Sequence, residues 1–170
     1  MPADVLTEMF KAKPLLAFSL YTQAQADKLQ RMRDEIEALM ADTGTNEVFN
    51  EWQRATDFFW FFTLGAYEVL RTMDQHNRCF VPLVGSKITE MKRRIAPLRM
   101  PFAKQEYQGG GGPIGGENSI VGFKNGSFQY RVGDTVFDVR ETMAAVCDFL
   151  GGIKRDDVLA AMPIAKRETP

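Results

Sequence analysis

The longest stretch of sequence with helical periodicity spans residues 47–76, which read EVFNEWQRATDFFWFFTLGAYEVLRTMDQH. Apolar residues recur there at steps of three and four, which is the spacing of one helix face. The main inner face is expected to hold Phe49, Trp52, Thr56, Phe59, Thr63, Ala66, Leu70 and Met73. Around residues 57–62, DFFWFF, the segment is apolar on nearly every side. Other helices of the chain or a second copy must therefore cover it.

A second helix is predicted before this segment, over residues 22–42. Thr22 and Gln25 have the spacing of a capping box at its start. Its buried stripe would consist of Leu29, Met32, Ile36 and Leu39, and the charged residues that would face water are Lys28, Arg31, Arg33, Asp34 and Glu35. Residues 43–46, TGTN, would end this helix and cap the next one.

A third helix is predicted over residues 87–107, with Ile88, Met91, Ile95, Leu98 and Phe102 on one face. Pro97 and Pro101 lie inside it, and an interior proline removes a backbone hydrogen bond. The sequence therefore predicts a kink, or two shorter helices that meet near Ala96. The next residues, GGGGPIGG at 109–116, are expected to form a flexible loop.

From Ser119 onward the apolar period changes to two, which predicts three antiparallel strands. Asn125-Gly126 is a two-residue hairpin signal that pairs Phe123 with Phe128, Val121 with Tyr130 and Ser119 with Val132. A turn at Gly133-Asp134 then pairs Phe137 with Tyr130 and Thr135 with Val132. Both registers place the same apolar residues on one face: Val121, Phe123, Phe128, Tyr130, Val132 and Phe137.

Asp138 and Glu141 would form a capping box for a last helix, which runs to Leu150 and ends at Gly151-Gly152. Its expected inner residues are Val139, Met143, Val146 and Leu150, and a short helical turn is expected near residues 155–162. The chain is thus predicted to be one mostly helical α+β domain, residues 1–170. It would consist of a bundle of three long helices (22–107), the glycine-rich loop (109–116), and a C-terminal three-stranded antiparallel meander with a packing helix (118–152).

Composition restricts the classes of function. Twenty-one Lys+Arg residues nearly balance 22 Asp+Glu residues, whereas nucleic-acid-binding modules usually carry a basic excess. The chain has neither an apolar run long enough for a membrane span nor the pattern of a signal peptide, which predicts a cytoplasmic protein without a membrane partner. Cys79 and Cys147 show neither disulfide nor zinc spacing, so no metal and no cofactor is expected.

One candidate site lies on the predicted 47–76 helix. Steps of four and three residues align Asn50, Arg54, Asp57, Phe61, Leu64, Glu68, Arg71 and Gln75. This stripe, with Asp57, Phe61 and Glu68 as its binding residues, is either a groove for a partner or a solvated helix flank that carries a Glu68–Arg71 ion pair.

A second candidate is the basic 87–104 segment. Six basic residues against Glu90 leave a net charge of plus five; they are Lys87, Lys92, Arg93, Arg94, Arg99 and Lys104. Residues 45–76 hold five acidic and two basic residues, a net charge of minus three. The opposite signs predict pairing between the two helices, within one chain or across a dimer, or alternatively a track for phosphates on Arg93, Arg94, Arg99 and Lys104.

The third candidate is the pair Arg71 and His76, the only histidine of the chain, in the segment Arg71-Thr-Met-Asp-Gln-His76. An arginine followed after four residues by a histidine resembles the motif of HEPN domains, dimerising helical bundles of which many are RNases. The resemblance implies that Arg71 stabilises phosphate charge and that His76 transfers a proton. Lys104 takes the place of the histidine in a second such segment, residues 99–104. A histidine at a helix end is equally explained by the helix dipole.

These observations predict a non-enzymatic binding or interaction protein that forms a homodimer through its aromatic surface, with another protein as a possible partner. The alternative is a HEPN-like endoribonuclease or an inactive relative, in an RNA-processing, toxin or defence system, with RNA as its partner. A small-molecule sensor that uses the aromatic interior is a third class.

Overall fold

The computed structural model describes residues 3–41, 48–109, 112–115 and 119–163. In chain order these residues form α1 (Ala3–Ala12), the 3₁₀ turn η1 (Pro14–Ala17), α2 (Leu20–Ala41), α3 (Val48–Gln75), η2 (Asn77–Cys79) and α4 (Pro82–Lys104). The sheet follows as β1 (Ile120–Lys124), β2 (Ser127–Val132) and β3 (Thr135–Asp138), and the chain ends with α5 (Val139–Gly152) and η3 (Arg155–Asp157). The caps predicted at residues 43–46 lie outside the described residues.

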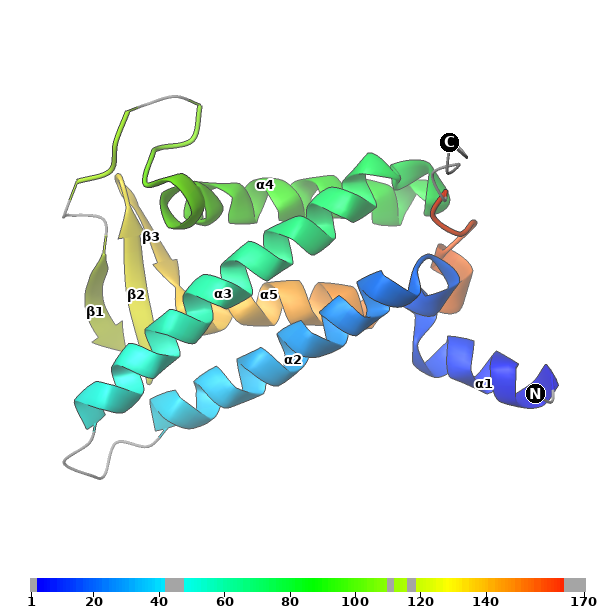
Figure 1. The fold of residues 1–170 in the computed structure, drawn as a ribbon, viewed down its shortest axis with the longest axis horizontal. Coiled ribbons are helices and arrows are strands. Elements are labelled where there is room, and N and C mark those ends of the chain that lie inside the picture. The colour runs from blue at the N-terminus through cyan, green and yellow to red at the C-terminus, as the bar shows by residue number, and fades with distance from the viewer. Residues whose placement is uncertain (1–2, 42–47, 110–111, 116–118, 164–170) are drawn as a thin grey trace, which may run out of the picture.

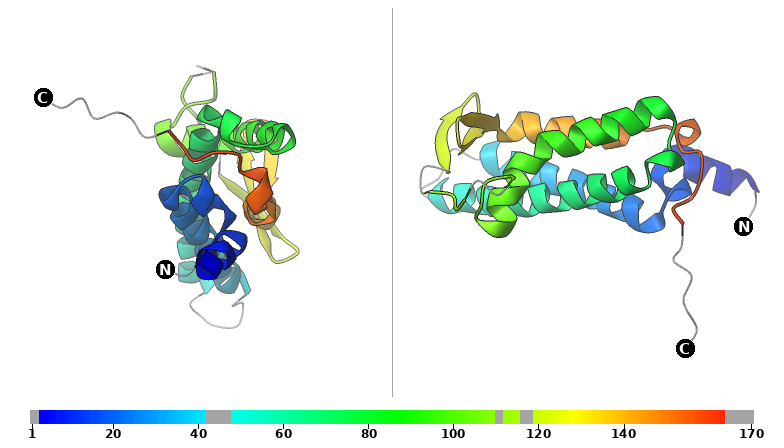
Figure 2. Two further views of the ribbon diagram at one scale, coloured as in Figure 1. Left: turned by 90° about the vertical axis from the view of Figure 1, so that its right-hand side faces the viewer. Right: turned by 90° about the horizontal axis from the view of Figure 1, so that it is seen from above.

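The predicted α+β class is confirmed: a helical bundle carries a small antiparallel sheet. The central helix α3 packs against α2 and against α4, while α5 packs against α2 and β2 (Figure 1). The sheet lies at one end of the helices, and α1 lies at the other end (Figures 1 and 2). Within the described chain, none of the helices combines the length and the apolarity needed to cross a membrane.

The core forms around α3, as its sequence predicts. Phe59, Thr63, Ala66, Leu70 and Met73 are buried, whereas Trp52 and Thr56 are half-buried. Nothing is described for the side chain of Phe49. The buried surface is wider than one stripe, because Ala55, Phe62 and Val69 are also buried. Packing on two flanks, by α2 and by α4, explains this width.

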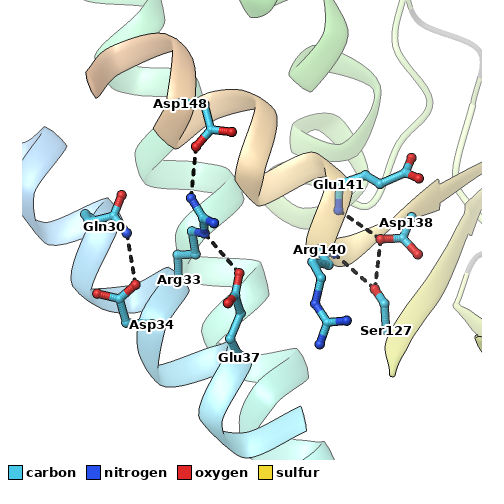
Figure 3. Close-up of polar contacts among 9 residues, drawn as sticks. All are labelled: Gln30, Arg33, Asp34, Glu37, Ser127, Asp138, Arg140, Glu141 and Asp148. Carbon is cyan, nitrogen blue, oxygen red and sulfur yellow. Dashed lines mark hydrogen bonds and ion pairs between the residues drawn. The ribbon is translucent and has the colours of Figure 1, made fainter. Parts of the chain in front are cut away.

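The first part of the chain differs most from the prediction. The elements α1 and η1 were not expected, and α2 begins at Leu20 rather than at residue 22. The cap assigned to Thr22 is wrong, because Thr22 is buried inside the helix and its N–H donates to Ser19 Oγ at 3.3 Å. Arg33 does not simply face water. It donates to Glu37 on α2 and to Asp148 on α5, at 2.9 and 3.1 Å (Figure 3).

The helix α4 is one unbroken helix, so the alternative of two shorter helices is wrong. It begins at Pro82, because proline is well tolerated in the first helical turn, and it ends where Gln105 adopts a left-handed φ of 56°. Pro97 and Pro101 each remove only one N–H donor. Pro101 is itself buried, as are Ile95 and Leu98 nearby, and the packing of these three residues holds the helix in the core.

The hairpin predictions hold near the turns and fail farther out. Asn125 and Gly126 both have positive φ, as a primed turn requires, and Phe123 lies opposite Phe128. The pairs Phe137–Tyr130 and Thr135–Val132 are also confirmed. A β-bulge at residue 121 then places Ile120 opposite Tyr130, so the predicted pairs Val121–Tyr130 and Ser119–Val132 are wrong.

The last helix α5 begins as predicted, with Glu141 N donating to Asp138 Oδ1 at 2.9 Å, but it continues through Gly152 rather than ending at Leu150. Its residues Val139, Met143, Val146 and Leu150 are buried, as expected. The helical turn expected near residues 155–162 is limited to η3. Beyond it, Met162 N donates to Phe18 O at 2.8 Å, so the C-terminal segment crosses back to η1.

The opposite charges of α3 and α4 do pair within one chain. Asp74 on α3 accepts hydrogen bonds from Thr89 and Lys92 on α4. Burial opposes ionisation of the Asp74 carboxyl, but the Lys92 and Thr89 contacts together outweigh it and lower the pKa of Asp74. The pair therefore ties the C-terminal end of α3 to α4.

Asp74→Asn is expected to lower the free energy of unfolding by about 1–3 kcal/mol at neutral pH, because Lys92 loses its carboxylate partner. The native pKa lies below the unfolded value of about 3.9, so the contribution is present above that pH and is lost as the pH falls through the native pKa. Urea denaturation at several pH values measures it. Asp156→Asn, at an exposed position in η3, is the control, and a loss of stability that does not depend on pH would contradict the ion-pair explanation.

Candidate functional site

Large apolar side chains gather on the surface where α3 meets the sheet. Trp60, Phe61, Ile120, Val121 and Phe123 are between 38% and 53% exposed. The first two lie on α3 and the other three on β1, which is an edge strand (Figure 1). Exposed apolar groups that cluster in this way are characteristic of binding surfaces rather than of ordinary protein surface.

Two adjoining hollows lie between these elements. The first, of about 350 Å³, is lined by Thr56, Asp57, Phe59, Trp60, Phe102, Ser119, Ile120, Phe128, Tyr130 and Val139. The second, of about 450 Å³, is lined by Trp52, Gln53, Thr56, Ile120, Gly122, Phe123 and Phe128. Because Thr56, Ile120 and Phe128 line both, the hollows form one surface feature, which we call the α3–β1 groove.

Aromatic contacts hold the walls of the groove in place. The ring of Trp52 stacks on that of Phe123 at 5.2 Å and meets the edge of Phe128 at 5.7 Å. Trp60 Nε1 donates to the carbonyl of Phe102 at 2.9 Å, and its ring lies 4.7 Å from that of Phe61. These contacts join α3 to β1, β2 and the end of α4, so the groove exists before any ligand binds.

The groove contains few polar groups. Asp57 is exposed in the lining, and burial raises the pKa of Tyr130, whose phenol is therefore neutral at physiological pH. Trp52 Nε1 is buried and, within the described part of the chain, has no hydrogen-bond partner. An unpaired buried donor costs free energy in the folded chain.

The structure separates the residues that the sequence grouped on the stripe of α3. Asp57 lines the groove, and Phe61 lies at its rim beside Trp60. Glu68 instead pairs with Arg71 at 2.7 Å and with Arg99 of α4 at 3.8 Å. Arg99 also lies over the ring of Tyr67, at 5.0 Å from its centroid. Glu68 and Arg99 thus connect α3 to α4.

The remaining basic candidates lie on the solvent side of α4. Arg93, Arg94 and Lys104 are exposed, whereas the ion pairs described for this helix use Lys92 and Arg99. The proposed phosphate track is thus divided, since one of its four residues points to α3. The other three remain a prediction for RNA binding.

Arg71 and His76 have different surroundings in the structure. Arg71 lines a hollow of about 360 Å³ between α2 and α3, together with Tyr21, Thr22, Gln25, Gly65, Glu68, Val69 and Thr72. His76 does not line it. His76 precedes η2, and its ring lies 6.3 Å from that of Phe18. The RNase arrangement, which joins these residues across two protomers, stays a prediction.

The other potential sites offer fewer groups that could bind a ligand or react. A hollow of about 820 Å³ lies between α1 and residues 151–156 and has a mixed lining of apolar and charged side chains. Burial raises the pKa of Cys147 to about 11, so its thiol stays protonated at neutral pH. No three His, Cys, Asp or Glu side chains among the described residues are placed to hold a metal ion.

Sequence reasoning missed the half of the groove that β1 supplies. Trp52 was assigned to the core, and Ile120 was not singled out. The available signal was the two-residue turn at Asn125-Gly126, because it makes β1 the first strand of a meander and leaves one of its edges unpaired. No protein-family model, curated protein or solved structure matches the chain. Its function is therefore inferred from its own residues.

Proposed function

We propose that this protein is a non-enzymatic interaction protein that binds an apolar segment of another protein molecule in the α3–β1 groove. The observation that carries the proposal is that the exposed side chains of Trp60, Ile120 and Phe123 line two adjoining hollows. The exposed ring of Phe61 lies next to that of Trp60. Covering such a surface removes apolar area from water, which contributes roughly 25 cal/mol per Å² before the costs of association.

The composition of the groove favours a protein ligand. Tryptophan and other aromatic side chains are enriched at the energetic centres of protein interfaces. Here Trp52 and Trp60 are held by ring contacts and a hydrogen bond, so little side-chain entropy is lost on binding. The polar groups of the lining, such as Thr56, Asp57 and Ser119, lie among these rings and can fix the orientation of a bound segment.

Binding can be measured without a label, because Trp52 and Trp60 are the only two tryptophans of the chain and both line the groove. A phage-displayed random-peptide library would be selected on the wild-type protein, and the enriched peptides would be synthesised. Titration with these peptides is expected to shift tryptophan emission to shorter wavelength. Ile120→Asp, at a residue that lines both hollows, is expected to raise the dissociation constant by about tenfold or more, as for a residue at the centre of an interface, and Phe61→Ala at the rim is expected to raise it by a smaller factor.

Leu83→Ala is the matched control, because Leu83 is an exposed leucine on α4 that lines none of the hollows described above. It should leave the dissociation constant unchanged. Equal binding by the wild type, Phe61→Ala and Ile120→Asp would show that the peptides bind elsewhere. A library that yields no peptide with an emission change would also count against a protein-binding groove.

A further inference from the structure

We propose that the molecule bound at the α3–β1 groove is a second copy of this chain, joined by antiparallel pairing of the two β1 strands about a two-fold axis at Gly122. This inference rests on the proposed function and names its partner. The pairing would join the three-stranded sheets of the two copies into one six-stranded sheet.

Among the described residues, the outer edge of β1 has no paired strand. In the sheet order β1-β2-β3 this strand pairs on one side only (Figure 1). All five of its residues are exposed. Lys124 and Ser127 close a two-residue turn. The N–H and C=O of Phe123, one residue further from the turn, therefore point away from β2 and toward the open edge. An added strand can bond to them.

The sequence of β1, IVGFK, is suited to pairing with itself in one register. Antiparallel pairing centred on Gly122 places Phe123 of each copy opposite Val121, the residue at the bulge, of the other, an aromatic and β-branched pair. It also places Lys124, the only charged residue of the strand, opposite Ile120 rather than opposite a second lysine. Parallel in-register pairing would instead set the two lysines side by side.

Gly122 suits the centre of such an interface. No described residue comes within 4 Å of the position that a Cβ would occupy there. Its φ is not positive, so backbone conformation does not require the glycine. Where two strands meet on a two-fold axis, the absence of a side chain allows the backbones to approach closely.

Pairing at this edge would also close the groove. A two-fold axis that runs perpendicular to the joined sheet keeps the α3 helices of both copies on the same face. The pairing sets the partner's β1 strand directly beside Phe123, so that strand would lie along the open side of the groove. The apolar residues that β1 now exposes would thereby be covered.

The first test of this pairing introduces charged residues at position 122, on the proposed two-fold axis. Wild-type protein at about 0.1 mM is expected to show twice the 19.2 kDa mass of one chain in light scattering. Gly122→Lys puts two lysines face to face and is expected to weaken the dimer by about a hundredfold or more. Gly152→Lys is the matched control, since nothing lies within 4 Å of its Cβ position either and it lies at the far end of α5. An equal mixture of Gly122→Lys and Gly122→Glu should restore a dimer.

A second measurement does not depend on charge. Gly122→Cys is expected to form a disulfide-linked dimer on mild oxidation with copper phenanthroline, because facing residues of antiparallel strands lie within disulfide range. Gly152→Cys should stay unlinked. A monomeric wild type, or a dimer that Gly122→Lys leaves intact, would overturn the β1 pairing. The proposed groove would still be tested separately by peptide binding and the Phe61→Ala variant.

Discussion

Phe62→Ala is expected to lower the free energy of unfolding by about 3–5 kcal/mol, whereas Phe61→Ala, one residue earlier, is expected to lower it by less than about 1 kcal/mol. The two residues differ in environment and not in type. Phe62 is 0% exposed and its ring stacks on Phe59 at 6.5 Å, while Phe61 is 53% exposed. Truncation of Phe62 leaves a cavity between packed helices, and truncation of Phe61 leaves no cavity.

Urea denaturation followed by circular dichroism measures both values. The two substitutions should be made in a Gly122→Lys chain, so that self-association does not add a stabilisation that depends on protein concentration. Similar losses for Phe61→Ala and Phe62→Ala would mean that both phenylalanines are buried to the same degree. Such a result would contradict the position of α3 at the centre of the bundle and would also remove Phe61 from the rim of the groove.

The contrast between Phe61 and Phe62 also shows what periodicity can predict. The three-and-four spacing located α3 and most of its buried face, because burial on one helix depends on the positions of apolar residues along that helix. Within the DFFWFF segment it placed Phe59 on the inner face and Phe61 on the outer stripe, but it did not predict that Phe62 is buried. Whether Phe61 or Phe62 is buried depends on the directions from which α2 and α4 pack, and these directions are set by residues distant in sequence.

Helix ends and strand register were less predictable for a similar reason. Thr22 and Ser19 are both good capping residues, and the choice depends on η1, where Gln23 Oε1 accepts from the N–H of Leu15 at 3.0 Å. Arg33 looked like a surface residue because its partner, Asp148, is 115 positions away. The bulge at residue 121 is likewise absent from the alternation pattern, since one extra residue shifts the register without changing the residue types.

In the candidate site too, the residues on one helix could be predicted from the sequence and the contacts between distant segments could not. Asp57 and Phe61 belong to a single helix, so one stripe could identify them as binding residues. The other wall of the groove is formed by β1, and it requires the chain after α4 to return to the start of α3. In the described part of this connection, Tyr107 N donates to Gly112 O and Ile114 N donates to Gln105 O, at 3.0 and 2.9 Å. No local pattern in the sequence specifies that return, and so the wall that β1 adds to the groove was not predicted.

Asp138 joins the sheet to the bundle, and Asp138→Ala is expected to lower the free energy of unfolding by about 2–3 kcal/mol. Its Oδ1 accepts from Glu141 N and from Ser127 Oγ, both at 2.9 Å (Figure 3). Its Oδ2 accepts from Gln129 Nε2. Substitution removes the N-cap of α5 and leaves the side chains on β2 without their acceptor. Asp134→Ala, in the exposed β2–β3 turn, should change stability by no more than about 0.5 kcal/mol.

Asp138→Ser separates the two contributions, because serine retains the cap of α5 and cannot replace both carboxylate oxygens on β2. It should recover roughly 1 kcal/mol of the loss. The groove provides a further readout, since Phe128 and Tyr130 of β2 line it. If Asp138 holds β2 in place, Asp138→Ala should shift tryptophan emission to longer wavelength even where the protein stays folded, and Asp138→Ser should shift it less. Destabilisation without any emission change would mean that the cap alone matters and that other contacts position the sheet against α3.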